Sequence, residues 1–288
     1  MPTQQAKVAV GAGKSAEALR EWLRGVFGPA LASLALVASV GAVVVGAPSD
    51  TPVVVIDPGH GGADFGARGD AGVLEKDVVL AVSRRIGRRL TARGFTVVFT
   101  RERDVFVSLP ERTEIANRAR GDLFLSIHAN SAASAKVEGP ETYFLSVEAS
   151  DAEAMRVAMI ENEVFRQEGT SPDDSLIVGE ILGDLIRTEH LRVSSDLATA
   201  IQRSLAAALG VSRGVKQAPF VVLVGVNMPA ALIELGFLTH PKEEQRLGRR
   251  DYQGAMAEAI AAAVATYYEP RRRAGRKEAL QMKRRADQ

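Results

Sequence analysis

Two of the four histidines in this chain stand at the ends of hydrophobic runs that are typical of buried strands. His60 follows the segment 53–57, and His128 closes the segment 123–127. In an open α/β sheet, the carboxyl ends of the strands face the ligand crevice. Two imidazoles at such ends, with a carboxylate nearby, are suited to bind zinc and to leave one coordination position open for a substrate.

Two glutamates are placed to complete such a site. Glu75 opens the helix that follows the glycine-rich loop after His60, so its carboxylate can fold back toward the same crevice. Glu234 ends the apolar segment 231–233, where burying a carboxylate is costly without a purpose. Near a zinc-bound water, Glu234 would act as general base and then as acid to a leaving amine. Singly, each residue also fits a structural role, such as a first-turn carboxylate at a helix N-terminus.

The apolar pattern predicts the elements that position these residues. Strands are expected over residues 52–57, 95–100, 122–127, 142–145, 220–224 and 230–235. Helices are expected from Glu75 to Arg93, from Ser108 as N-cap to Arg120, and over 152–167, 176–189, 195–209 and 251–268. This order predicts a single α/β domain with a mostly parallel, six-stranded sheet flanked by helices, and a helical insert between the fourth and fifth strands.

Composition and the N-terminal segment limit the class of protein. The chain has 288 residues and a net charge of +1, so its overall charge does not indicate a nucleic-acid partner. It has no cysteine, which excludes thiolate zinc ligands. Residues 27–47 are uncharged and weakly apolar, so we expect 1–47 to be a cleaved export signal or a membrane anchor, with a buried core helix as the alternative. The expected location is the periplasm or the outer face of the cytoplasmic membrane.

Four ordered motifs resemble the signature of the zinc-dependent N-acetylmuramoyl-L-alanine amidases of the type 3 family. They are Asp57-Pro58-Gly59-His60-Gly61-Gly62, Glu75-Lys76-Asp77, Ser126-Ile127-His128-Ala129-Asn130 and Glu234-Leu235-Gly236-Phe237. The stretch from Thr100 to Asn117 also matches. The resemblance covers roughly residues 52–268 and implies a catalytic domain over 48–269.

The resemblance also implies roles for the site residues. His60, Glu75 and His128 correspond to zinc ligands, and Glu234 corresponds to the catalytic glutamate. The implied reaction is hydrolysis of the amide between N-acetylmuramic acid and L-alanine in peptidoglycan, for cell-wall remodelling or the separation of daughter cells. Two alternatives stay open: a non-catalytic peptidoglycan-binding envelope protein, and a zinc peptidase, although the chain has no His-Glu-x-x-His motif.

The region 147–191 resembles the insert of the autoinhibited cell-division amidases, in which a helix covers the zinc and contributes a glutamate. The best-matching segment is Ile160-Glu161-Asn162-Glu163. We therefore hypothesise that Glu161, with Glu163 as second choice, occupies the open zinc position. An activator protein would then dock on the apolar face formed by Ile181, Leu182 and Leu185. Alternatively, the insert helices only pack on the core.

The C-terminal segment 270–288 is rich in lysine and arginine. We expect it to be disordered and solvated. A second interpretation is that it binds acidic envelope polymers or anionic lipid headgroups.

Overall fold

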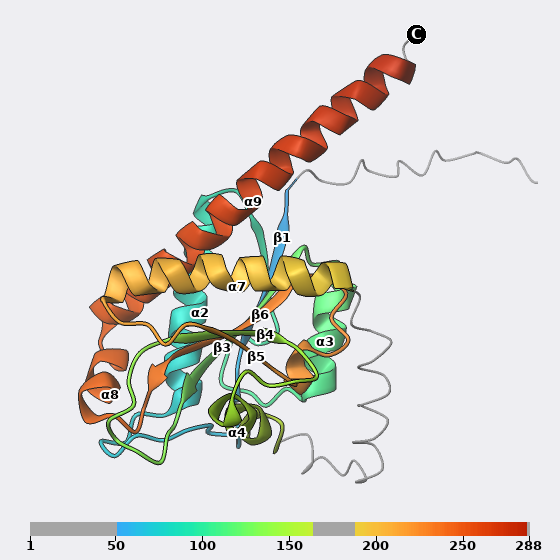
Figure 1. The fold of residues 1–288 in the computed structure, drawn as a ribbon. Helices are drawn as coiled ribbons and strands as arrows, with labels where there is room; N and C mark the ends of the chain where they lie inside the picture. Colours follow the sequence, from blue (N-terminus) through green and yellow to red (C-terminus); the bar gives the residue numbers. More distant parts are fainter. Residues whose placement is uncertain (1–50, 164–187, 287–288) are drawn as a thin grey trace, which may run out of the picture. The chain divides into compact units, whose positions relative to one another are not determined.

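A six-stranded sheet between helices forms the frame of the protein (Figure 1). The computed structural model describes residues 51–163 and 188–286. The strands lie in the order β2-β1-β3-β6-β4-β5. Their bounds are β1 Val53–Pro58, β2 Thr96–Phe99, β3 Leu123–Asn130, β4 Glu141–Leu145, β5 Val215–Ala218 and β6 Ala230–Phe237. All neighbouring strands are parallel except β4 and β6, so the prediction of a mostly parallel sheet is confirmed.

Helices cover both faces of this sheet because side chains alternate between the faces along each strand. On one face, Val54 and Ile56 of β1 pack in a cluster with α2 (Glu75–Ala92), α7 (Thr188–Leu209) and α9 (Arg250–Ala286). On the other face, Val55 packs with the smaller elements α3 (Leu109–Arg118), α4 (Ala152–Glu161) and the 3-10 turn η1 (Val221–Leu223). A short helix, α8 (Pro241–Leu247), follows β6.

The central strands β3 and β6 are buried along their whole length. Continuous apolar runs such as these are typical of parallel strands that are covered on both faces. Two helix boundaries also agree with the sequence pattern. The Ser108 side chain caps α3 by accepting a hydrogen bond from the Glu111 amide, and Gly94, with a φ of +81°, follows the end of α2.

The predicted strand over 220–224 is wrong. Residues Val221–Leu223 form the turn η1, whose Val222 and Leu223 side chains are buried against the second face of the sheet. The fifth strand instead is β5, which pairs in parallel with β4. Its central residues, Lys216 and Gln217, are polar because β5 lies at the edge of the sheet, whereas a short apolar run by itself does not distinguish a strand from a buried turn.

The predicted insert, 147–191, lies between β4 and β5 as expected, and its described part contains α4 and the first residues of α7. Helix α7 begins at Thr188, before the predicted start at 195, while most of the predicted helix 176–189 lies outside the described residues. The segment 1–47 also lies outside them. The backbone of α9 continues past residue 270 to Ala286, and the proposed disorder and solvation of the basic segment 270–288 stay a prediction.

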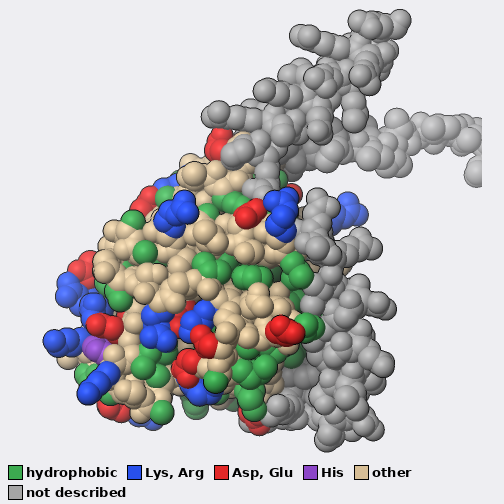
Figure 2. Space-filling view, viewed as in Figure 1, with side chains coloured by type: hydrophobic (Ala, Val, Ile, Leu, Met, Phe, Trp, Pro, Cys, Tyr) green, Lys and Arg blue, Asp and Glu red, His purple; other side chains and the backbone are tan. Residues whose placement is uncertain are grey.

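Among the described residues, no helix combines the length and apolar character needed to cross a membrane. On the face drawn in Figure 2, acidic and basic side chains are interspersed among polar and apolar ones. This mixed surface agrees with the net charge of +1.

Candidate metal centre

His60 lies two residues after the end of β1, in a loop with an unusual backbone. Its φ is +57°, and the two glycines that follow it also have positive φ values. For a residue with a Cβ atom this left-handed conformation costs roughly 1–2 kcal/mol. Asp64 fixes the ring by a hydrogen bond between His60 Nδ1 and Asp64 Oδ2 of 2.8 Å. The Nδ1–H therefore donates to Asp64, which leaves Nε2 as the ring nitrogen that can bind a metal once its proton is displaced.

His128 lies on β3 beside the His60 loop. The imidazole rings of His60 and His128 have centroids 5.0 Å apart and stand edge to face. Gly59 makes this approach sterically allowed, because a Cβ atom at residue 59 would lie 2.4 Å from His128 Cε1. Glycine at position 59 thus allows the backbone just before His60 to pack closely against the His128 ring.

Glu75, at the start of α2, joins the two histidines. Its Oε1 atom lies 3.0 Å from His60 Nε2 and 3.1 Å from His128 Nδ1. The carboxylate is also anchored by backbone amides: Ala129 donates to Oε1 at 2.9 Å and Ala67 donates to Oε2 at 2.7 Å. Glu75 is therefore held in one orientation toward both rings.

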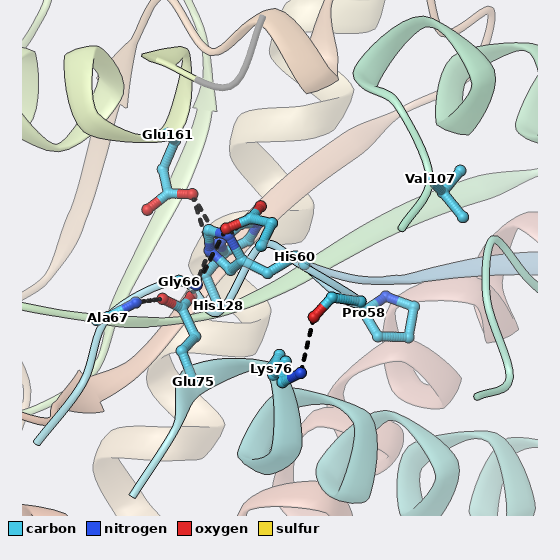
Figure 3. A network of polar contacts seen from close by, with 12 residues as sticks. Pro58, His60, Gly66, Ala67, Glu75, Lys76, Val107, His128 and Glu161 are labelled. Atoms are coloured by element: carbon cyan, nitrogen blue, oxygen red, sulfur yellow. Dashed lines mark hydrogen bonds and ion pairs between the residues drawn. The ribbon is translucent and has the colours of Figure 1, made fainter. Parts of the chain in front are cut away.

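The fourth member of the cluster is Glu161, the last residue of α4 (Figure 3). Its Oε2 atom lies 2.9 Å from His128 Nδ1 and 3.4 Å from His60 Nε2, and the side chain is only 9% exposed. One ligand atom from each of His60, Glu75, His128 and Glu161 lies within 4.8 Å of the others. Glu163 lines the same cavity, but it is exposed and does not belong to this set.

The donor atoms fit a divalent metal of the zinc type. Two imidazole nitrogens and two carboxylate oxygens are hard-to-borderline ligands, and the chain has no thiolate to offer. Bonds of about 2.0–2.2 Å from a tetrahedral zinc place ligand atoms roughly 3.4 Å apart, close to the separations found here. In addition, the buried Nε2 atom of His60 has no well-formed hydrogen bond. The cluster therefore suits a divalent metal such as zinc, with four side chains able to serve as ligands.

The charges in the cluster depend on one another. Burial lowers the pKa of both histidines, but Glu75 and then Glu161 raise the pKa of His60 well above its ordinary value. The carboxylate of Glu161, followed by that of Glu75, raises the pKa of His128 to about 10. Burial raises the pKa of Glu161, but His128 and His60 lower it below its ordinary range. A bound divalent cation would displace the imidazole protons, so metal binding is expected to release protons.

Glu234 lies next to this cluster on β6, in register with His128 on β3. It is fully buried, and neither carboxylate oxygen has a hydrogen-bond partner among the described residues. Burial, and then the negative charge of Glu161, raise the pKa of Glu234 well above its ordinary value. A buried, unpartnered carboxyl group with a raised pKa beside potential metal ligands is suited to transfer protons.

A cavity of about 560 Å³ opens beside the cluster. It is lined by His60 and Glu75 on one side and by residues of α4 on the other, and these α4 residues are Arg156, Met159, Ile160 and Glu161. Sequence reasoning did not identify Asp64 or Arg156. Asp64 follows His60 by four residues, and an acidic residue near a proposed ligand was the one available signal. Nothing in the sequence pattern indicated that Arg156 would face the cavity.

The fold and the cluster define a class of protein: an α/β protein with potential metal-binding side chains at the carboxyl edge of its sheet. Comparison with known proteins gives the family. The model of the N-acetylmuramoyl-L-alanine amidase family matches residues 54–266. N-acetylmuramoyl-L-alanine amidase AmiA of Escherichia coli K12 is 38% identical over 221 residues, which cover 75% of this chain and 76% of that protein.

Solved structures agree. Amidase AmiC2 of Nostoc punctiforme shares 33% identity and a TM-score of 0.57, covering 76% of this chain and 97% of the other. An N-acetylmuramoyl-L-alanine amidase of Clostridium difficile 630 shares 29% identity and a TM-score of 0.59, covering 77% and 98%. The chain belongs to the N-acetylmuramoyl-L-alanine amidase family, and it is an enzyme that hydrolyses this amide bond in peptidoglycan. The predicted activity is confirmed over the binding-protein and peptidase alternatives.

Proposed function

We propose that the amidase uses zinc held by His60, Glu75 and His128, that Glu234 is its catalytic acid–base group, and that Glu161 inhibits the resting enzyme. Bound zinc would lower the pKa of a coordinated water and polarise the scissile carbonyl. The observation that carries the proposal is the convergence of four ligand atoms from the β1 loop, α2, β3 and α4 within 4.8 Å.

The chain's own residues supply the remaining chemistry. Asp64 holds the His60 ring so that Nε2, not Nδ1, faces the cluster. The backbone amides of Ala67 and Ala129 fix the Glu75 carboxylate. Glu234 would accept a proton from the attacking water and pass it to the leaving L-alanine amine. Its raised pKa falls when the negative charge of Glu161 is withdrawn, so displacement of Glu161 favours the ionised, basic form of Glu234.

The proposed inhibition rests on the position of Glu161. Its carboxylate contacts His128 at 2.9 Å and lines the cavity together with His60 and Glu75, so it would occupy the position that a water or a substrate carbonyl needs. Helix α4 is also part of the core, because Ala154, Val157 and Ala158 are buried against the second face of the sheet. Opening the site therefore requires α4 to lose packing, which favours the closed state at rest.

Release of fragments from purified peptidoglycan by the zinc-loaded chain tests these roles. Glu234→Gln is expected to lower the rate by about 10²–10⁴-fold. Glu161→Gln is expected to raise the rate by about tenfold, equivalent to losing about 1.4 kcal/mol of preference for the closed state. Glu163→Gln, two residues away on the same segment, is the matched control and should leave the rate unchanged.

New amino termini in the products must belong to L-alanine. An unchanged rate in Glu161→Gln would refute inhibition by this residue, and a gain in Glu163→Gln would transfer the role to the neighbouring glutamate. Point substitutions are preferable to deletion of residues 147–191, because removing α4 would also uncover Tyr143 and Phe220 in the core.

Export and activation complete the proposal. The uncharged run at 27–47 and the peptidoglycan substrate favour a location in the periplasm or at the outer face of the cytoplasmic membrane. An activator protein would dock on the insert; its expected contact residues, Ile181, Leu182 and Leu185, lie outside the described residues. Amino-terminal sequencing of protein recovered from the cell envelope would distinguish a cleaved signal, with a start near residue 48, from an anchor that retains residues 27–47.

A further inference from the structure

Two buried arginines surround the loop that carries His60. Arg101 follows β2 and Arg112 lies on α3, and the two are 3% and 2% exposed. Fully buried arginines are uncommon because transferring a charged group out of water is costly unless it is paired and hydrogen-bonded. Each guanidinium here binds backbone carbonyls of the Pro58–His60 segment, which carries a potential metal ligand. This arrangement points to a role in the metal site as well as in core packing.

Arg112 reaches both ends of the loop. Its Nη1 donates to the Pro58 carbonyl at 2.8 Å and its Nη2 donates to the His60 carbonyl at 2.9 Å. The same side chain is anchored by a 2.7 Å ion pair to Asp57 Oδ1 and by a hydrogen bond to the Val107 carbonyl (Figure 3 labels Pro58, His60 and Val107). A planar guanidinium with donors in fixed directions can make these contacts at once, whereas an ammonium group cannot.

Arg101 holds the centre of the loop. Its Nε donates to the Pro58 carbonyl at 2.9 Å and its Nη2 donates to the Gly59 carbonyl at 2.7 Å. A third bond, from Nη2 to the Lys76 carbonyl, ties the loop to the first turn of α2, which carries Glu75. The two arginines thus bind three successive carbonyls and connect the elements that supply His60 and Glu75.

This arrangement carries an electrostatic cost. Asp57 is the one carboxylate in direct contact with either guanidinium among the described residues. Burial, and then the positive charge of Arg112, lower the pKa of Arg101 to about 10, so the Arg101 guanidinium remains charged at neutral pH. The loop backbone supplies the compensating carbonyl dipoles. His60 adopts a φ of +57°, which is unfavourable for a residue with a side chain. Without the two arginines, the loop carbonyls would be free to rotate, and the His60 backbone could relax to an ordinary conformation.

We propose that Arg101 and Arg112 are positioning residues of the metal site, which hold the Pro58–His60 backbone in the left-handed turn that aims His60 at Glu75 and His128. They do not touch the reacting atoms; they act through the geometry of a ligand. This inference rests on the proposed metal site and deepens it.

The test is the zinc dissociation constant of the full-length chain, measured by competition with a chromophoric chelator. Arg112→Lys and Arg101→Lys keep the charge and lose the fork of donors. Each is expected to raise the dissociation constant by about 10–100-fold, as for other residues that orient metal ligands. Arg118→Lys is the matched control, because Arg118 also lies on α3 but its side chain is 71% exposed. The zinc affinity of this variant should equal that of the wild type.

Urea unfolding of the chelated proteins separates positioning from a purely structural role. If either folded lysine variant is less stable but binds zinc as tightly as the wild type, the proposal is overturned. Arg101→Lys decides the question if Arg112→Lys does not fold, because Arg101 has no direct ion pair to lose. A wild-type chain that binds no zinc would instead refute the proposed metal site. The cobalt-substituted variants should also show an altered visible spectrum, reporting a changed ligand geometry.

Discussion

At the scale of single residues, the site is built from charges that would be unfavourable alone. Glu234 is buried without a hydrogen-bond partner, and Asp57 is buried but bound by Arg112 and by the hydroxyls of Thr100 and Ser126. The two carboxyl groups have opposite pKa shifts for this reason. Partners stabilise the charge of Asp57, whereas burial and a neighbouring carboxylate oppose the charge of Glu234. Asp57 is therefore suited to a structural role, and Glu234 is suited to proton transfer.

The stability contributed by Asp57 should depend on pH. Burial raises its pKa, but Arg112 and the two hydroxyls outweigh burial and lower the pKa below the ordinary value of 3.8. Because the folded-state pKa is depressed, this contribution is present above pH 3.8 and is lost as the pH falls through the folded-state pKa. Asp57→Asn should therefore reduce the free energy of unfolding by about 3–5 kcal/mol at pH 7, and by less below pH 3.8.

Urea unfolding of the chelated protein between pH 7 and pH 3 measures this difference. Glu114→Gln is the control, because the Glu114–Arg118 pair is exposed and such pairs contribute little. A difference between wild type and Asp57→Asn that stays constant over this range would contradict the assignment.

At the scale of elements, α4 is held at both ends. Asp151 caps its N-terminus by accepting from the Ala154 amide at 2.7 Å. At the C-terminal end, Asn162 donates from Nδ2 to the Pro219 carbonyl at 2.8 Å and accepts from the Val221 amide at 2.9 Å. Asn162 follows Glu161 directly, so the same contact that fastens the helix also fixes its carboxylate in the cluster.

Loss of the Asn162 contacts should weaken inhibition. Asn162→Ala is expected to lower the free energy of unfolding by about 1–2 kcal/mol and to raise basal amidase activity, because α4 leaves the cluster more easily. Asn227→Ala replaces an exposed asparagine in the loop before β6 and should change neither quantity. Paired urea unfolding and peptidoglycan release provide the measurement; destabilisation with no gain in activity would separate the fastening of α4 from control of the site.

At the scale of the whole molecule, the metal ligands connect elements far apart in sequence. The β1 loop, α2 and β3 meet at the cluster, and α4 of the insert closes it. A metal at this point would bind the folded chain and not the separated segments of the unfolded chain. Metal binding is therefore coupled to global stability.

Removal of zinc should lower the melting temperature. At free zinc about a thousandfold above its dissociation constant, binding contributes about 4 kcal/mol, equivalent to roughly 8–16 °C for a domain of this size. Thermal unfolding with and without a chelator checks this shift, and adding back zinc, but not magnesium, should restore it. A melting temperature unaffected by chelation would argue against metal binding by the folded protein.

The sequence by itself determined the frame of the enzyme and the position of its chemistry along the chain. Continuous apolar runs at β1, β3 and β6 and helical spacing in α2 are local signals, and they suffice to predict the α/β class. His60 follows β1, Glu75 begins α2, and His128 and Glu234 lie in the C-terminal halves of β3 and β6, so the topology of a parallel sheet brings the four residues to one edge. The Ser108 N-cap of α3 is also a local signal, because its hydrogen bond joins residues only three positions apart.

Only the tertiary structure decided which distant groups meet. The edge strand β5 contains polar residues, and only its pairing with β4 shows that this segment is a strand. The apolar run at 221–223 is a buried turn instead. Likewise, the contact of Glu161 with the two histidines depends on how α4 packs across the sheet. The hydrogen bonds from Arg101 and Arg112 to the His60 loop join residues more than forty positions apart. Such contacts follow from packing and long-range hydrogen bonds, which no periodicity of side chains encodes.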